Sequence, residues 1–201
     1  MNNEIQQKKP EILAPAGGSE QLIAAVRCGA DAVYLGTDGF NARQNAKNFS
    51  DSELKDAVAY CHARNVAVHV ALNTLIFDDE IKNLINKIEA IADCGADAVI
   101  VQDVAAAKAV RECCPEMHLH ASTQMSIHNS DGVKEAARLG FSRAVLAREL
   151  TLDEIKTITA KSDIETEVFV HGALCTCISG ACYLSAMLGG RSGNRGYCAQ
   201  P

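Results

Sequence analysis

Four cysteines near the carboxyl end of the sequence are the residues best suited to chemistry. Cys175, Cys177, Cys182 and Cys198 lie among glycines and small residues in the stretch that begins at Glu167. Thiolates gathered on an irregular loop can bind a soft metal, because each contributes charge and a polarizable sulfur while the flexible backbone supplies the angles. An iron–sulfur cluster and zinc both fit this description. The alternative is that these thiols are small buried hydrophobes, as free cysteines often are, but the four together favour a metal site.

The composition is that of a globular protein able to bury a full core. The 201 residues are 48% hydrophobic and 22% charged, which fits one large domain or a fragment of a larger protein. No apolar run approaches the length of a membrane span, and Met1 to Lys9 is polar without a signal-peptide core, so we expect a cytoplasmic protein. The nine cysteines should then be reduced or metal-bound rather than paired in disulfides.

The net charge of −6 gives the chain no general attraction for nucleic acid or for an anionic membrane. An RNA contact would therefore need a local basic patch or residues absent from this chain.

Short apolar segments alternate with helical patterns along the chain. After a disordered lead over residues 1–9, the predicted strands are residues 10–17, 32–35, 66–72, 98–101, 118–122, 143–146 and 167–170. The predicted helices are residues 19–28, 51–65, 79–94, a fourth that ends at 115, 130–139 and 152–160. Gly29 and Gly95 directly follow two of these helices, as glycines often do at helix ends.

An internal repeat shows how these elements are organised. Gly29-Ala-Asp-Ala-Val33 recurs as Gly95-Ala-Asp-Ala-Val99, and Gly140-Phe-Ser-Arg-Ala-Val145 is a looser third copy. Each copy marks the end of a helix followed by a strand, so the repeating unit is one strand and one helix. Such units, with short apolar strands, imply a parallel sheet covered by helices.

The repeat predicts an α/β fold of the (β/α)8 TIM-type barrel class. A doubly wound sheet is less favoured, because no GxGxxG follows the first strand and polar residues end nearly every strand. Barrels of this class typically need about 250 residues, and seven strands can be identified here. We therefore predict an incomplete barrel, open between its first and seventh strands, in which the eighth strand is missing or supplied differently.

The active site of such a barrel lies at the carboxyl ends of its strands. The polar residues predicted at that end are Asn41, Arg43, Asn73, Gln102, Asp103, Ser122, Gln124, Arg148, Glu149 and His171. As a set they predict a pocket for a carboxylate-bearing small molecule, with Arg43 and Arg148 as the anion ligands. The alternative is a local turn or capping role, which is favoured for Thr37, Asn73 and Ser122.

Other polar residues give weaker signals. His69, His118 and His120 alternate within strands, so we expect them to face the core or the helix layer. Arg148 and Glu149 are adjacent, and the two could simply form a pair of charges. No HExxH, GxSxG or P-loop pattern occurs in the sequence.

The cysteine stretch resembles the motif of the collagenase-like peptidase family U32. The matching positions are Glu167, Phe169, Gly172, Ala173, Leu174, Cys175, Gly180, Cys182, Leu184 and Ser185. The tail from Arg191 to Pro201, the segment Ala14–Gly17 and Asn41-x-Arg43 also resemble that family, so the resemblance extends from Pro10 onward. Family members are usually longer and continue with a further cysteine. The resemblance thus implies that residues 10–201 are the N-terminal barrel portion of a longer protein.

What the resemblance implies about activity is divided. Members of the family are described as collagenases, as tRNA and ribosomal RNA hydroxylation proteins, and as ubiquinone-synthesis hydroxylases that carry a 4Fe–4S cluster and are linked to prephenate. Carried over by position, it implies Cys175, Cys182 and Cys198 as cluster ligands, with a fourth ligand beyond Pro201. Cys177 falls at a variable position and is a spectator or a substitute ligand. In the isolated chain we expect the cluster to be weakly held, absent or replaced by zinc.

Three functional classes stay open. The favoured one is a prephenate-linked iron–sulfur hydroxylase of a tRNA or rRNA base, or of another small aromatic substrate. Its candidate catalytic residues are His171, Glu149 and Gln124, and its candidate substrate-binding residues are Asn41, Arg43, Asn73 and Arg148. The second class is a peptidase with Cys175 or Ser185 as nucleophile beside His171. The third is a scaffold subunit that forms a homo- or hetero-oligomer with a partner of the same family.

Overall fold

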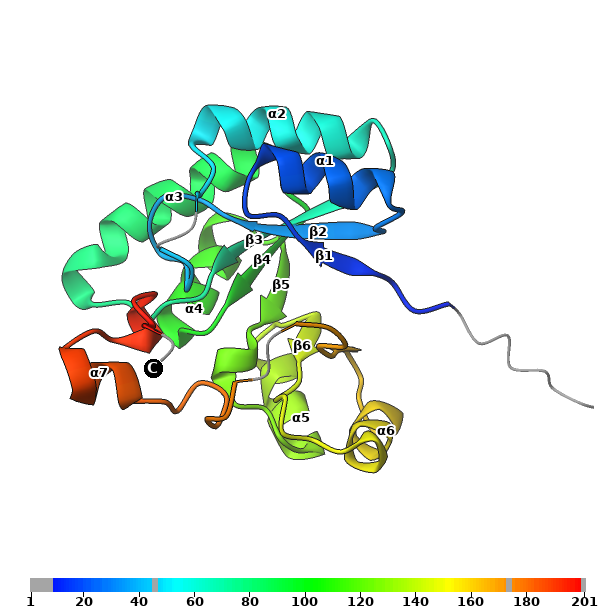
Figure 1. The fold of residues 1–201 in the computed structure, drawn as a ribbon, viewed down its shortest axis with the longest axis vertical. Helices are drawn as coiled ribbons and strands as arrows, with labels where there is room; N and C mark the ends of the chain where they lie inside the picture. The colour runs from blue at the N-terminus through cyan, green and yellow to red at the C-terminus, as the bar shows by residue number, and fades with distance from the viewer. Residues whose placement is uncertain (1–8, 45–46, 173–174, 200–201) are drawn as a thin grey trace, which may run out of the picture.

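A sheet of seven parallel strands forms the centre of the molecule (Figure 1). The computed structural model describes residues 9–44, 47–172 and 175–199. The strands lie side by side in chain order, and they are β1 (Leu13–Pro15), β2 (Ala32–Gly36), β3 (Ala67–Leu72), β4 (Ala98–Val101), β5 (His118–Ala121), β6 (Arg143–Val145) and β7 (Glu165–Glu167). The sheet curls into a barrel that does not close between β1 and β7, as predicted.

Helices connect the strands on the outside of the curled sheet (Figure 1). They are α1 (Ser19–Arg27), α2 (Asp51–His62), α3 (Ile81–Asp93), α4 (Val104–Cys113), α5 (Ser130–Arg138) and α6 (Leu152–Ala160), and α7 (Leu184–Gly189) follows β7. Three short 3-10 turns are η1 (Asp78–Glu80), η2 (Thr123–Met125) and η3 (Gly193–Arg195). Capping boxes begin two of the helices, Ser50 with Glu53 at α2 and Thr151 with Glu154 at α6. No described helix is long and apolar enough to cross a membrane.

The repeated Gly-Ala-Asp motif fixes the passage from helix to strand. Gly29 and Gly95 have φ values of +89° and +82°, a left-handed conformation that glycine adopts at low cost after a helix. Two residues later, Asp31 and Asp97 each accept a hydrogen bond from a backbone N–H at or just before the start of a neighbouring strand, at 2.8 and 2.7 Å. In the third copy Ser142 takes this place, and its N–H and hydroxyl both donate to a carbonyl of β5.

The outward face of the sheet is apolar and packs against the helices. One cluster of buried side chains includes Val33, Leu35, Val68, Val70, Val99 and Leu119 from the strands and Leu22, Leu54, Leu84, Ile88 and Val110 from the helices. Burying each such side chain contributes about 1.5–3 kcal/mol. This layer, which lies outside the barrel, is the main hydrophobic core.

The inward face of the sheet is polar. Tyr34 is in register with His69, and His120 with Arg143. The rings of His69 and His120 meet edge to face with centroids 4.7 Å apart, and each residue is only 4% exposed. Their predicted place in the core is confirmed. The same expectation was wrong for His118, which is exposed because it opens β5 at the end of the barrel.

Arg143 connects the two edges of the open sheet. Its guanidinium pairs with Glu165 and Glu167 of β7, at 2.6 and 3.4 Å, and with Glu11 ahead of β1, at 2.7 Å. Burial raises the pKa of Glu167, although Arg143 opposes this shift. Because β1 and β7 do not pair with each other, these ion pairs span the open side of the barrel.

The seventh strand lies earlier than residues 167–170, where the sequence predicted it. β7 covers Glu165–Glu167, and the N–H of Leu146 donates to the carbonyl of Glu167 at 2.9 Å. β6 ends at Val145, so the following residues have no strand to pair with and extend into solvent, where Val170 is 90% exposed. Apolar β-branched composition suggested the strand, but the pairing of β7 carboxylates with Arg143 fixes its position.

The remaining element bounds agree with prediction to within a few residues, apart from the first strand. That strand was predicted over residues 10–17 and is shorter, at Leu13–Pro15. The predicted disordered lead lies, except for Lys9, outside the described residues.

The buried histidine pair predicts a loss of stability in mild acid. Burial lowers the pKa of His69 to about 4 and that of His120 to about 2, from an ordinary value of 6.5. Since the folded pKa values lie below the unfolded one, both rings stabilise the fold above pH 6.5, and this stability is lost as the pH falls below 6.5. At about pH 5 each ring should cost about 2 kcal/mol of unfolding free energy.

Urea unfolding of wild type and of a His69→Leu, His120→Leu variant between about pH 7 and pH 5 checks this expectation. The variant should lose most of the pH dependence, whereas His118→Leu, a change at an exposed ring, should keep it. An equal slope in all three proteins would show that the buried pair does not set the acid sensitivity.

Candidate functional site

Two cysteine-bearing segments lie over the carboxyl ends of the strands. The cysteine loop, residues 175–182, contacts the ends of β5 and β6, and the tail loop, residues 191–199, contacts the segments that follow β2, β3 and β4. The short helix α7 joins them (Figure 1, orange and red). Both loops therefore lie at the end of the barrel where the sequence predicted the site.

The cysteine loop is attached to the barrel through Ser179, which is fully buried. Both carboxylate oxygens of Glu149 accept hydrogen bonds from Ser179, one from its backbone N–H and one from its hydroxyl at 3.1 Å. The Nε of Arg148 donates to the same hydroxyl at 3.2 Å. Burial alone would raise the pKa of Glu149, but the hydrogen bonds from Ser179 hold it below its ordinary value. Arg148 and Glu149 thus both bind the loop.

A close backbone contact reinforces this attachment. Gly180 has a φ of +76°, and a Cβ at this position would overlap the carbonyl oxygen of Gln124. The hydroxyl of Ser126, a residue that is itself left-handed with a φ of +56°, donates to the carbonyl of Ser179. The ring of His128 contacts the carbonyl of Ser126 at 2.7 Å and approaches Glu149 to 3.7 Å. The left-handed conformation of Ser126 carries strain and persists only where the surroundings hold it.

Arg195 attaches the tail loop to the segment after β3. Its guanidinium pairs with both carboxylate oxygens of Glu80, at 2.5 and 2.7 Å, and lies 4.6 Å from the ring centroid of Phe77. The hydrogen bonds from Arg195 lower the pKa of Glu80. A planar guanidinium suits such two-point pairing, so lysine would be a poor replacement here.

Backbone groups of the tail loop complete its attachment. The carbonyl of Asn194 accepts from the N–H of Leu75 at 3.1 Å and from the side chain of Gln102 at 3.3 Å. Gly196 has a φ of +83°, and a Cβ there would overlap the carbonyl oxygen of Asn41. Gln102 of the predicted set therefore binds the tail loop.

The polar segment after β2 is organised by its own side chains. The side-chain amide of Asn41 donates to the carbonyl of Thr37 at 2.6 Å and accepts from the N–H of Arg43 at 2.7 Å. The side-chain oxygen of Asn73 accepts from the N–H of Ala42 at 2.9 Å. Asn41 is only 1% exposed. Arg43 differs, because its side chain is exposed and uses one nitrogen, Nη2, to donate to the hydroxyl of Tyr34 at 2.6 Å.

The four thiols divide between the two loops. Cys175, Cys177 and Cys182 share the cysteine loop, where hydrogen bonding to Cys182 and the charges of both neighbours raise the pKa of Cys177. Cys198 lies on the tail loop, with its sulfur 3.8 Å from the hydroxyl of Ser185. Among the described residues, no three His, Cys, Asp or Glu side chains converge closely enough to form a metal site.

The other five cysteines lie away from the two loops, and only Cys61 among them is a fully buried apolar side chain. Cys28, Cys61, Cys94, Cys113 and Cys114 are spread over α1 to α4 and the residues that follow those helices. Cys61 is completely buried, and burial raises its pKa to about 11. Thiols of this kind are poor metal ligands and poor nucleophiles.

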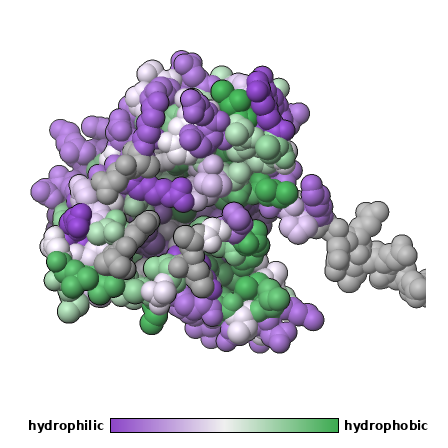
Figure 2. Space-filling model, viewed as in Figure 1, coloured by the Kyte–Doolittle hydropathy of each residue, from purple (hydrophilic) through white to green (hydrophobic). Residues whose placement is uncertain are grey.

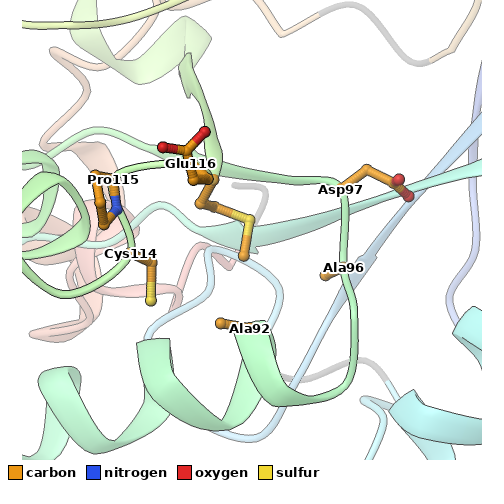
Figure 3. Close-up of a pocket in the computed structure, with 7 residues that line it drawn as sticks. Ala92, Ala96, Asp97, Cys114, Pro115 and Glu116 are labelled. Atoms are coloured by element: carbon orange, nitrogen blue, oxygen red, sulfur yellow. The ribbon is translucent and has the colours of Figure 1, made fainter.

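A cavity of about 400 Å³ lies at the opposite end of the barrel (Figure 3). Its lining consists of Ala92, Ala96, Asp97, Cys114, Pro115, Glu116 and Met117. These residues come from the end of α3 and from the segments leading into β4 and β5. None belongs to the predicted polar set, and the active sites of such barrels lie at the other end.

The structure brings the predicted residues together in two groups. Gln124, Arg148 and Glu149 lie with the cysteine loop, and Asn41, Asn73 and Gln102 lie with the segments that hold the tail loop. His171 belongs to neither group, because β7 ends four residues before it and its side chain is exposed. Ser122 caps η2, as its predicted local role requires.

Sequence reasoning missed the residues that hold the loops in place. Ser126, Ser179 and the pair of Glu80 with Arg195 were not singled out. The one usable signal was Gly180 within a cysteine-rich loop, since an isolated glycine often marks a close backbone approach.

Comparison with solved structures supports the fold. A structure titled as the U32 peptidase Mk0906 superposes with a TM-score of 0.69 and 16% identity, covering 84% of this chain and 71% of that one. An enzyme titled as a putative deoxyribose-phosphate aldolase from Coccidioides immitis gives a TM-score of 0.52 at 12% identity, covering 79% of this chain and 69% of that one. At such identities the likeness concerns the fold alone.

Several curated proteins are similar in sequence. The 23S rRNA 5-hydroxycytidine C2501 synthase of Escherichia coli is 40% identical over 98% of this chain and 29% of its own length. The tRNA hydroxylation protein P1 of Bacillus subtilis is 38% identical over 96% of this chain and 46% of its own length. A protein of Porphyromonas gingivalis named collagenase is 39% identical over 94% of this chain and 48% of its own length. The chain thus spans less than half the length of each of these relatives.

The match to a protein family extends over most of the chain. The family model described as peptidase family U32 matches residues 17–201, which include β2 to β7 and both cysteine-bearing loops. The chain therefore belongs to peptidase family U32.

Proposed function

We propose that this chain carries the site of an RNA-modifying enzyme that hydroxylates a base of tRNA or rRNA. The observation that carries the proposal is that two separate loops bring Cys175, Cys182 and Cys198 to the carboxyl ends of the barrel strands. Relatives named as a 23S rRNA 5-hydroxycytidine synthase and as tRNA hydroxylation proteins support the reaction class. A 4Fe–4S cluster held by these cysteines, with prephenate as a co-substrate, is part of the proposal.

The chemistry of the donor set suits an iron–sulfur cluster, although the described thiols must move closer together to bind one. Cys175 and Cys198 are exposed and Cys182 is partly exposed, on loops in which Gly180 and Gly196 take left-handed conformations. Thiolates are the usual cluster ligands. The fourth ligand is either Cys177, which contacts Cys182, or a group outside this chain. When bound, such a cluster would supply one-electron redox chemistry.

The chain's own residues position the loop and bind the substrates in this proposal. Glu149 and Arg148 hold the cysteine loop through Ser179, so their role is positioning. The side-chain oxygen of Gln124 is buried and has no hydrogen-bond partner among the described residues. In this proposal it accepts a hydrogen bond from an N–H or O–H of the substrate. His171 is the exposed candidate for moving a proton.

Arg43 is suited to bind an anionic co-substrate. Its guanidinium forms no ion pair among the described residues and lies 5.1 Å from the ring centroid of Tyr34, which holds it in place. Guanidinium groups bind carboxylates through two parallel hydrogen bonds, and prephenate is a dicarboxylate. Asn41 and Asn73 shape the segment that presents Arg43.

A peptidase mechanism has less support from the geometry. Ser185 is 4% exposed, and its hydroxyl accepts from the N–H of Ala199 and donates to Cys198. No hydrogen bond joins His171 to Cys175 or Ser185 in the described part of the chain. A nucleophile needs a base within hydrogen-bond reach, which these residues do not show. The relative named collagenase keeps this class as the alternative to be tested.

Expression in a host from which its own genes for proteins of family U32 have been deleted tests the proposed reaction. Mass spectrometry of nucleosides from tRNA and rRNA should reveal one nucleoside with an added oxygen atom when the wild-type chain, alone or within a longer natural form, is supplied. Cys182→Ala should abolish that product, because it removes the thiolate with which the cysteine loop would bind the cluster. Cys28→Ala, at an exposed thiol on the far side of the barrel, is the matched control and should leave the product unchanged.

The same purified proteins should be incubated with collagen and gelatin. We expect no cleavage by any of them. Robust proteolysis by metal-free wild type, lost in Cys175→Ala but retained in Cys182→Ala, would overturn the redox proposal in favour of a cysteine peptidase.

The close contact at Gly180 predicts that an added methyl group releases the cysteine loop. In Gly180→Ala the left-handed backbone would cost the alanine about 1–2 kcal/mol, and its Cβ would overlap the carbonyl oxygen of Gln124. The loop must move away from Gln124 to remove both penalties. Hydrogen–deuterium exchange should therefore rise over residues 175–182 and stay unchanged in α2 and β3.

Gly17→Ala is the control for this substitution, because a Cβ at Gly17 would meet no atom within 4 Å. If Gly180→Ala exchanged like wild type over the cysteine loop, the loop would not depend on this contact.

A further inference from the structure

The last part of the chain, from Val168 onward, is here called the covering segment, and it carries no negatively charged side chain. From Val168 to the end of the chain the sequence contains no aspartate, glutamate or lysine and two arginines, in a protein whose net charge is −6. Its described part covers the carboxyl ends of the strands, where the cysteine loop and the tail loop lie. The segment itself thus adds no acidic residue to this surface, and the carboxylates beside it, Asp78, Asp79, Glu80 and Glu149, come from the barrel.

Three exposed aromatic residues lie on or beside the two loops. Phe77, Tyr183 and Tyr197 are 61%, 67% and 44% exposed. Arg195 lies against the ring of Phe77, and the N–H of Tyr197 donates to the carbonyl of Ser192, which keeps the tail loop compact. We call Phe77, Tyr183, Arg191, Arg195 and Tyr197 the aromatic–arginine surface.

One arginine of this surface is free to bind an anion. Arg191 makes no ion pair among the described residues, whereas Arg195 is paired with Glu80. Arg191 is exposed, and its backbone N–H is fixed by the carbonyl of Ser185 at 3.2 Å. An exposed arginine without a carboxylate partner retains its full charge for a phosphate.

We propose that the aromatic–arginine surface binds a single-stranded segment of the RNA substrate. This proposal rests on the proposed function above. Tyr183 and Tyr197 stack on unpaired bases next to the base that reacts, and Arg191 binds a backbone phosphate. Proteins recognise RNA mainly in single-stranded loops, where splayed bases stack on aromatic side chains. The covering segment also adds no carboxylate of its own that would repel a polyanion.

A polypeptide partner is the competing occupant. Met187 and Leu188 of α7 are 83% and 70% exposed, and Figure 2 shows apolar side chains gathered at the lower left over this helix. Exposed apolar patches often mark protein interfaces. The two exposed tyrosines and the unpaired Arg191, on a segment without carboxylates of its own, favour a nucleic acid, because an apolar protein interface requires none of these features.

Fluorescence anisotropy with a labelled single-stranded RNA tests the proposal on the purified chain. Tyr183→Leu and Tyr197→Leu should each weaken binding about tenfold, the range expected for loss of one base stack. Arg191→Gln should lower the slope of log K against log salt concentration by about 0.7, the value for one phosphate contact on a single strand. Duplex RNA of equal length should bind more weakly than the single strand.

The pair of Tyr60 and Arg64 provides matched controls. Arg64 lies 3.7 Å from the ring centroid of Tyr60 where α2 ends, at the opposite end of the barrel. Tyr60→Leu and Arg64→Gln should leave the RNA affinity and its salt slope unchanged. Equal losses in the control and test variants would overturn the proposal, as would wild-type affinity in Tyr183→Leu, Tyr197→Leu and Arg191→Gln.

Two outcomes separate this proposal from the proposed function. If cells that express Tyr197→Leu and Arg191→Gln still contain the hydroxylated nucleoside at wild-type levels, the surface is wrong while the reaction stands. If wild type binds single-stranded RNA and the variants do not, yet no nucleoside is modified, the surface stands and the reaction is wrong. A dimer that Met187→Ser disperses, with RNA affinity unchanged in the tyrosine variants, would identify a protein interface instead.

Discussion

The attachment of Ser179 to Glu149 is the interaction on which the candidate site depends. A loop rich in glycine and small residues has little apolar surface of its own to bury, so its position must come from hydrogen bonds and close backbone contacts. Two hydrogen bonds to one carboxylate, together with the approach of Gly180 to Gln124, supply these contacts. Glu149 therefore acts through the loop that it holds.

The barrel provides a scaffold whose two faces have different tasks. Its outward face buries the apolar side chains against the helices and contributes most of the stability. Its inward face carries His69, His120 and Arg143, and the ion pairs of Arg143 span the side where no strand closes the barrel. These ion pairs, which start from the amino ends of β6 and β7, join the two edges of the incomplete sheet on the side away from the candidate site.

The sequence was sufficient to predict the repeating strand–helix units, since a glycine follows three of the helices, at Gly29, Gly95 and Gly140, and an apolar run comes after it. It also indicated which end of the barrel carries the polar residues. It misplaced β7, because the pairing of Arg143 with Glu165 and Glu167, and not the β-branched run after them, sets that strand. The attachment of the loops could not be predicted, because contacts such as that of Arg195 with Glu80 join residues far apart in the chain.

The central claim is that thiols from two separately attached loops bind one redox-active cluster. The most direct test is the iron and sulfide content of the chain after anaerobic reconstitution, measured for wild type, Cys182→Ala and Cys198→Ala with the visible spectrum of each. Our account predicts a weakly held centre of at most about four iron atoms per wild-type chain and its loss in both variants, since each loop supplies a ligand. Unchanged iron content and spectrum in Cys198→Ala would contradict it, because the tail loop would then take no part in the site.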